Sequence, residues 1–192
     1  MTNFTKTAVV LAAALSFGPS AASAQSERQV DLSAGFMQVS SAMRGANVQL
    51  STPLTPGVSI VGEFDWSRGR DCGDCDPVYT DAAVLVGVRK AFRRDQRISP
   101  FAQVQGGVLH SKAGSYFYDS PFPGADFTEP GYTINYIALQ PGGGFTAWLT
   151  PRVGLIMQAD LQVAVSTHSE YTGTTGFPRI VTGAVIRLGG AR

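Results

Sequence analysis

The feature that most constrains the fold is the alternation, after residue 25, of strand-like segments with tight turns and long polar loops. Predicted turns lie near Thr52–Gly57, Phe92–Ile98 and Thr150–Arg152. Predicted loops lie near Ser40–Gly45, Arg68–Tyr79, Ala113–Gly131 and His168–Pro178. Connections that alternate in this way join eight antiparallel strands, with every loop at one end of the sheet and every turn at the other. The sequence therefore predicts an all-β, up-and-down sheet.

The first 24 residues have the pattern of a secretory signal peptide. Lys6 supplies a basic start, Ala8–Phe17 is a short apolar segment, and Ala22-Ser23-Ala24 matches the small-residue cleavage pattern. The alternative, a retained membrane anchor, is disfavoured because the apolar segment is well short of the roughly 20 residues that a spanning helix needs. We expect a signal peptide over residues 1–24 and one barrel domain over residues 25–192.

Charge and hydropathy exclude several classes of protein. The chain has 15 basic and 14 acidic residues, and removal of the leader takes away Lys6 alone, which leaves 14 of each. A balanced chain of this kind lacks the basic field that nucleic-acid binding needs, so we expect no nucleic-acid partner. No segment after the leader is apolar enough for a transmembrane helix, so only a closed barrel would take this chain across a membrane.

Each predicted strand separates into an apolar row and a more polar row. In the seventh, Leu155, Met157 and Leu161 share one face and Gln158 and Asp160 share the other. A soluble sheet points its apolar row inward, whereas a membrane barrel points it outward. Periodicity alone does not decide between these two orientations.

Three further features favour an outward apolar row. The polar rows carry charges near strand centres, at Asp31, Glu63, Asp65, Arg89, Asp160 and Arg187. The apolar rows end in aromatics such as Trp66, Phe92 and Phe145, as the interfacial girdles of a membrane barrel require. Small residues recur along the strands and suit a narrow, curved wall. We therefore predict an eight-stranded antiparallel up-and-down transmembrane β-barrel.

The predicted sixth strand, residues 137–148, is the least regular. Pro141 and Gly142–Gly144 interrupt its alternation. A proline inside a strand removes a hydrogen-bond donor from the ladder, so we expect a β-bulge there.

On these features the chain resembles the family of small outer-membrane barrels typified by the OmpA transmembrane domain and OmpX-like proteins. The runs Val86–Arg89, Pro100–Val104 and Gly183–Leu188 are common in such barrels. The resemblance covers nearly all of the mature chain. It implies the outer membrane of a Gram-negative-type bacterium, contact with outer-membrane lipid, and a monomer. Members of the family often end on an aromatic residue that the insertion machinery reads, whereas this chain ends Leu188-Gly-Gly-Ala-Arg192.

An eight-stranded barrel has an interior that side chains fill, so we expect no open pore. Charges that face such an interior must be paired, because lone buried charges are costly. We predict a lumenal charge network in which arginines meet carboxylates: Arg89 and Arg187 with Glu63, Asp65, Asp160 and Asp31. The alternative is a solvated sheet face with loosely paired charges.

Cys72 and Cys75 form a C-x-x-C pair in the second predicted loop. A redox site of this kind needs a thioredoxin-like βαβ setting that the pattern lacks, and a structural zinc site needs two more ligands. Export favours a local loop disulfide. We expect no metal and no cofactor.

The third predicted loop is rich in aromatic residues: Tyr116, Phe117, Tyr118, Phe122 and Phe127. Exposed aromatics form a recognition surface or anchor a loop in the headgroup region, and the sequence leaves both interpretations open. We expect any extracellular partner to bind through this loop.

His168-Ser169-Glu170 and His110-Ser111 contain the residue types of a nucleophilic hydrolase. Adjacent residues in a strand point to opposite faces, so polar loop composition is the preferred explanation. We predict a structural or surface-interaction role and no enzyme activity. The alternatives are a soluble secreted or periplasmic lipocalin-like barrel that binds a small apolar ligand and, third, an outer-membrane lipid hydrolase.

Overall fold

The computed structural model describes residues 29–39, 43–70, 78–92, 96–118, 127–167 and 173–189. The long strands are β1 (Val30–Val39), β2 (Met43–Thr55), β3 (Val58–Gly69), β4 (Tyr79–Ala91), β5 (Ile98–Ala113), β8 (Thr133–Trp148), β9 (Val153–Ser166) and β10 (Thr174–Leu188). Two short strands, β6 (Tyr116–Tyr118) and β7 (Phe127–Glu129), lie inside the predicted third loop. Within these ranges, no helix is long and apolar enough to cross a membrane.

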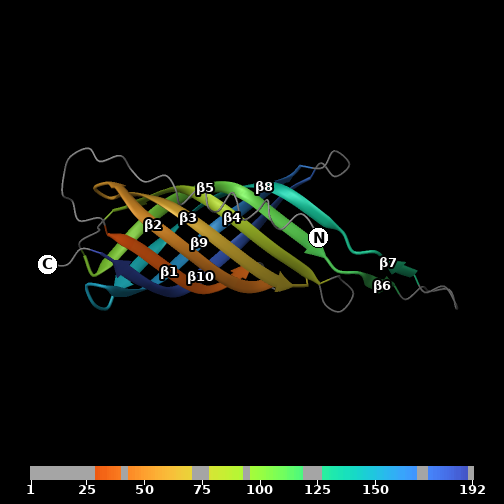
Figure 1. Cartoon of the computed structure of the whole chain (residues 1–192), viewed down its shortest axis with the longest axis horizontal. Helices are drawn as coiled ribbons and strands as arrows, with labels where there is room; N and C mark the ends of the chain where they lie inside the picture. The colour runs from red at the N-terminus through yellow and green to blue at the C-terminus, as the bar shows by residue number, and fades with distance from the viewer. Residues whose placement is uncertain are drawn as a thin grey trace.

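The eight long strands form one closed antiparallel barrel in the order β1-β10-β9-β8-β5-β4-β3-β2, with strongly tilted strands (Figure 1). Pairing of β1 with β10 closes the wall, and Gly35 stands opposite Gly183 in that ladder. Strands β6 and β7 form a separate two-stranded sheet that projects beyond one end of the barrel (Figure 1). The predicted eight-stranded up-and-down barrel is confirmed.

Two predicted loops and one predicted turn are shorter than expected. Strand β2 begins inside the predicted loop Ser40–Gly45, and β10 begins inside the predicted loop His168–Pro178. Pro178 takes its place in the β10–β9 ladder without a register shift. The turn after β2 narrows to Pro56-Gly57, where Gly57 has a positive φ of 75°. Hydrogen bonding to neighbouring barrel strands therefore extends β2 and β10 into segments that local residue preferences assign to loops.

The predicted bulge at Pro141 is wrong. The ladder from β8 to β5 passes through Pro141 in constant register. The ladder from β8 to β9 omits Gln140 and Pro141 and then resumes in the same register. The donor that proline lacks is therefore accommodated as a gap in one ladder, with no extra residue inserted. A register shift does occur in a different ladder, that of β2 with β3, between Pro53 and Thr55 beside the turn.

The apolar rows face outward on every barrel strand. One exposed apolar residue per strand, in chain order, is Phe36, Val48, Phe64, Val86, Val108, Ile137, Leu161 and Ile180. The inward rows are buried and mostly polar. This is the orientation of a membrane barrel and the reverse of a soluble one. A lipocalin-like cavity needs Leu155, Met157 and Leu161 to point inward, and all three are exposed on the outer face.

Aromatic side chains lie toward both ends of the outer face. Trp66 is exposed near the loop end of β3, and Phe145 and Phe92 are exposed near the turn end. Interfacial aromatics of this kind anchor a barrel at the level of the lipid headgroups.

We predict that an arginine on the outer face destabilises the barrel according to its depth. Leu161 lies near the middle of β9, and Val153 begins the same strand on the same face. An arginine costs about 2–4 kcal/mol at the bilayer midplane and about 0–1 kcal/mol near the interface. Leu161→Arg should lower the free energy of unfolding from lipid vesicles by the larger amount, and Val153→Arg by the smaller. Equal losses in reversible denaturant titrations would contradict this orientation.

Candidate functional site: a polar network in the barrel lumen

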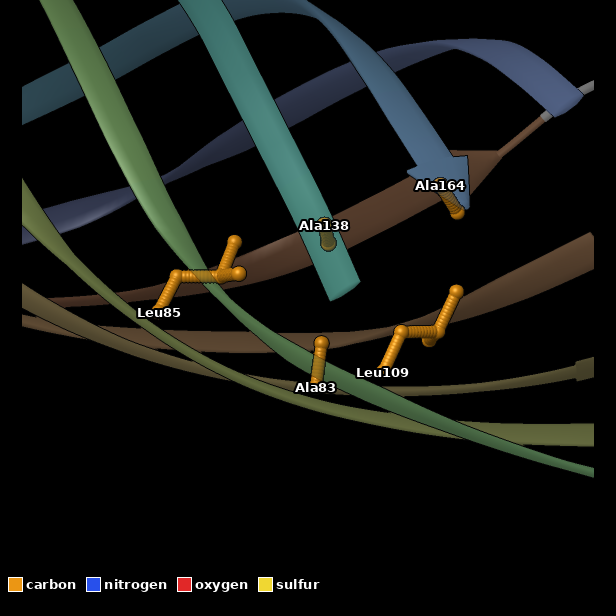
Figure 2. Close-up of a cluster of buried hydrophobic side chains, with 5 residues drawn as sticks. All are labelled: Ala83, Leu85, Leu109, Ala138 and Ala164. Atoms are coloured by element: carbon orange, nitrogen blue, oxygen red, sulfur yellow. The ribbon is translucent and has the colours of Figure 1, made fainter. Parts of the chain in front are cut away.

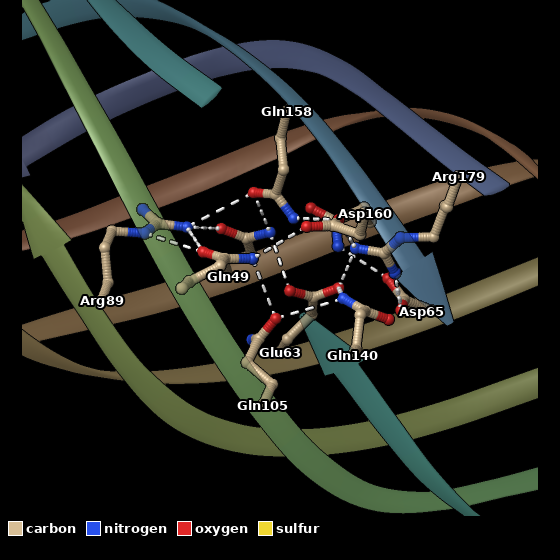
Figure 3. Close-up of polar contacts among 11 residues, drawn as sticks. Gln49, Glu63, Asp65, Arg89, Gln105, Gln140, Gln158, Asp160 and Arg179 are labelled. Carbon is tan, nitrogen blue, oxygen red and sulfur yellow. Dashed lines mark hydrogen bonds and ion pairs between the residues drawn. The ribbon is translucent and has the colours of Figure 1, made fainter. Parts of the chain in front are cut away.

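The inward rows bring a set of polar side chains together in the barrel interior (Figure 3). We call this set the lumenal network: Asn47, Gln49, Glu63, Asp65, Arg89, Gln103, Gln105, Gln140, Gln158, Asp160 and Arg179. Every barrel strand except β1 contributes at least one member. Alternation along each strand explains this composition, because residues two apart share the inward face.

Arg179 of β10 is the centre of the lumenal network. Its side chain is fully buried and forms ion pairs with Glu63 and Asp65, which lie two residues apart on β3. Its Nη2 also lies 3.2 Å from Asp160 Oδ2, and Asp160 stands directly opposite Arg179 in the β10–β9 ladder. One guanidinium therefore bridges carboxylates from two strands, with charge-assisted hydrogen bonds in a planar fork.

Amide side chains donate to the same carboxylates. Gln49 Nε2 donates to Glu63 Oε2 over 2.8 Å, and Gln140 Nε2 donates to Glu63 Oε1 over 3.2 Å. Asn47 Nδ2 donates to Asp65 Oδ1 over 2.6 Å. Buried carboxylates are tolerated when their lone pairs are satisfied in this way. The amide side chains thus supply hydrogen-bond donors to the carboxylates in addition to those of Arg179.

Gly142 gives Asp160 its space. It stands opposite Asp160 in the β8–β9 ladder, and a Cβ built on Gly142 would overlap the Asp160 carboxylate. The glycine interruption of the predicted sixth strand therefore has a specific role in the packing of the lumenal network.

Arg89 binds amide oxygens and not carboxylates. Its Nη2 donates to Gln49 Oε1 over 2.5 Å and to Gln103 Oε1 over 2.6 Å. Its guanidinium carbon lies 4.1 Å from the centre of the Phe101 ring, a cation–π contact. Among the described residues, no carboxylate forms an ion pair with Arg89.

Arg187 and Asp31 form a separate pair near the turn end. Arg187 Nε lies 3.1 Å from Asp31 Oδ1, and both side chains are partly exposed. The guanidinium carbon of Arg187 lies 3.9 Å from the centre of the Trp148 ring. This pair is too close to solvent to contribute as much as the buried pairs of Arg179.

The structure brings Glu63, Asp65 and Asp160 together, but around Arg179 instead of the predicted Arg89 and Arg187. The sequence pattern places Arg179 on the polar row of the eighth predicted strand, but the predicted network leaves it out because it lies at the start of that strand, directly after the segment assigned to a loop. Counting back along a β9–β10 hairpin would have placed it opposite Asp160, but only with the true start of β10.

Apolar side chains occupy other parts of the lumen. Figure 2 shows one cluster, with members from four neighbouring strands: Ala83, Leu85, Leu109, Ala138 and Ala164. A second cluster lies where β1 and β2 reach the loop end: Met37, Val39, Met43 and Val181, with Tyr79 and Phe177 packed against it. The inward rows are therefore not uniformly polar, and buried apolar groups lie in the interior beside the lumenal network.

Several predicted site residues fall outside the described ranges: Cys72, Cys75, Phe122, His168, Ser169 and Glu170. Tyr116, Phe117 and Tyr118 form β6, and Phe127 begins β7. His110 is exposed, with its Nδ1 2.8 Å from Asn135 Oδ1, and its neighbour Ser111 belongs to the opposite face of β5. In the described part of the chain, no group of three or more metal-binding side chains is suitably placed for a metal ion.

We predict that loss of Arg179 destabilises the barrel more than loss of Arg89. Removal of one partner from a buried ion pair costs about 3–5 kcal/mol. Loss of a donor to neutral acceptors costs about 1–3 kcal/mol. Arg179→Met should therefore lower the free energy of unfolding by the larger amount and Arg89→Met by the smaller, in denaturant titrations of the refolded barrel.

Arg152→Met, in the exposed turn before β9, is the matched control and should change stability little. Addition of Glu63→Gln and Asp65→Asn to Arg179→Met should recover part of the loss, because fewer unpaired charges remain buried. A stable Arg179→Met variant would show that the carboxylates do not depend on this guanidinium.

No protein-family model matches the sequence, and comparison with curated proteins finds no match. Solved structures do share the fold. The attachment invasion locus protein Ail of Yersinia pestis is 15% identical, with a TM-score of 0.52, over 84% of this chain and 99% of Ail. Neisserial surface protein A is 10% identical, with a TM-score of 0.53, over 84% and 95% of the two chains. A major outer membrane protein from Thermus thermophilus is 14% identical, with a TM-score of 0.52, over 84% and 99%. With its outward apolar wall and polar interior, this chain has the fold of the small eight-stranded outer-membrane barrels.

Proposed function

We propose that this chain is an outer-membrane protein of a Gram-negative-type bacterium, with a structural or surface-interaction role and no enzyme activity. The observation that carries the proposal is the reversed wall, which is apolar on the outside of all eight barrel strands and encloses the polar lumenal network. Only a lipid environment makes this arrangement favourable, because in water the exposed apolar rows would cost about 25 cal/mol for each Å². The predicted signal peptide over residues 1–24 supports export, with cleavage to a mature chain that acts as a monomer.

The lumen is proposed to be closed to solutes. Arg179, Gln140 and Gln158 are each at most 1% exposed, which places the lumenal network across the interior with little access to water. The two apolar clusters occupy further interior space, and dry apolar groups oppose the passage of ions. Closure supports a role in which the barrel carries its loops and does not transport a solute.

The β6–β7 hairpin is the proposed contact surface. It projects beyond the barrel wall (Figure 1), and its strands contain Tyr116–Tyr118 and Phe127 of the predicted aromatic surface. One structure of Ail is of a complex with the heparin analogue sucrose octasulfate. That complex supports ligand binding as a use of this barrel architecture. A Cys72–Cys75 disulfide is proposed to shape the loop between β3 and β4.

The localisation of the full-length chain tests the membrane assignment. After expression in a Gram-negative host, we expect recovery in the outer-membrane fraction and a mobility difference between boiled and unboiled samples on a detergent gel. An epitope inserted within residues 119–126 should be accessible to antibody on intact cells. Recovery of soluble protein from the periplasm would contradict the proposal, and an epitope seen only after lysis would reverse the orientation.

Conductance across a planar bilayer tests closure of the lumen. We expect no stable conductance steps from the refolded barrel, because buried side chains fill its interior. A large porin inserted under the same conditions serves as the positive control. Reproducible ion conductance from the wild-type barrel would show that solutes pass and would overturn the closed-lumen assignment.

A further inference from the structure

Three basic residues lie in one row across the outer wall at the loop end. Arg44 of β2 stands directly opposite Arg68 of β3, Arg68 stands opposite Thr80 of β4, and Thr80 stands opposite Lys112 of β5. We call Arg44, Arg68 and Lys112 the loop-end cation row. All three side chains are exposed, and Thr80 between them is neutral.

The pairing of Arg44 with Arg68 carries a cost. Directly opposite residues on one face of an antiparallel pair have Cβ atoms about 4.5–5.5 Å apart, and like charges in this position are destabilising. Among the described residues, no carboxylate forms an ion pair with either arginine. An anion between the two guanidinium groups would turn this repulsion into two sets of charge-assisted hydrogen bonds.

The wall next to the cation row is apolar. On the same outward face, two residues further from the loop end, lies the exposed Trp66, and beyond it lie Phe64, Val48 and Val108. The row is therefore at the border between a lipid-facing surface and the loops, and not at a loop tip. A ligand that fits both parts has a negative headgroup and apolar chains.

We propose that the loop-end cation row binds the phosphate of an anionic lipid in the leaflet that surrounds the loop end. The proposal rests on the membrane assignment made above. The phosphate accepts hydrogen bonds from the planar forks of Arg44 and Arg68. Lys112 lies two strand spacings from Arg68, about 10 Å, and adds a third positive charge for the same headgroup or its neighbour. The acyl chains lie along the apolar wall below Trp66.

The experiment compares lipids bound to the refolded full barrel. The protein is inserted into vesicles of phosphatidylcholine, with and without phosphatidic acid as the anionic probe. Lipids that remain bound after mild detergent extraction are then counted by native mass spectrometry. We expect the wild-type barrel to retain phosphatidic acid in preference to phosphatidylcholine. Arg68→Gln should weaken that preference about tenfold, the effect of losing one charge-assisted interaction.

Two further variants separate a built site from diffuse charge. Arg68→Glu places a carboxylate opposite Arg44, so it should keep or raise the thermal stability in phosphatidylcholine while it abolishes the preference for phosphatidic acid. Arg152→Gln removes an exposed arginine at the turn end and should keep the preference. A lower stability of Arg68→Glu would show that a carboxylate elsewhere already neutralises the two arginines, and would overturn the proposal.

Equal retention of the two lipids by the wild-type barrel would also overturn the lipid site. So would an equal loss of preference in Arg152→Gln, or full competition by inorganic phosphate at the same concentration, which would indicate a soluble anion as the ligand. Failure of the membrane assignment itself has a different signature. In that case the wild-type chain shows no heat-dependent mobility shift in phosphatidylcholine vesicles, before any anionic lipid is present.

Discussion

The ion pairs of Arg179 with Glu63, Asp65 and Asp160 are the interaction on which the rest of the interior depends. They connect β10 to β9, its neighbour, and to β3, which lies across the lumen. A buried carboxylate without a partner would be costly in this environment, so the position of the guanidinium decides whether the polar interior is stable. The surrounding amides follow from the same requirement, because Asn47, Gln49, Gln140 and Gln158 all donate hydrogen bonds to these carboxylates.

The polar interior and the apolar exterior are two aspects of one strand pattern. Because the side-chain period is two, a strand that places Gln158 and Asp160 inward must place Met157 and Leu161 outward. A shift of one residue in any ladder would exchange the two faces. The strand therefore keeps its register through Pro141 and loses one ladder hydrogen bond, because a shift in register would exchange its inward and outward faces.

Arginines occupy two different environments in this barrel, and the same electrostatics governs both. Inside the lumen, where the dielectric constant is low, carboxylates of the chain itself neutralise Arg179. On the outer wall at the loop end, Arg44 and Arg68 face each other in the ladder. The proposed anionic lipid would supply there the negative charge that β3 and β9 supply inside. The lumenal network thus stabilises the fold from inside, whereas the loop-end cation row is proposed to bind the surrounding lipid.

Alternation and the spacing of turns were enough to predict the barrel and the two rows of each strand, because these depend only on local period and chain direction. Charges near strand centres and aromatics at strand ends then predicted that the row with Leu161 faces outward and that Glu63, Asp65 and Asp160 face inward. The partner of those carboxylates was not predictable in this way. Arg179 meets them because tilt and ladder register bring β3, β9 and β10 to one level of the lumen, and these are properties of the closed wall. The expected bulge at Pro141 failed for a related reason, since hydrogen bonds to two neighbouring strands outweigh one missing donor. The sequence by itself determined which face each residue takes, and only closure of the barrel decided which residues meet across it, because height in the lumen depends on the register of every ladder together.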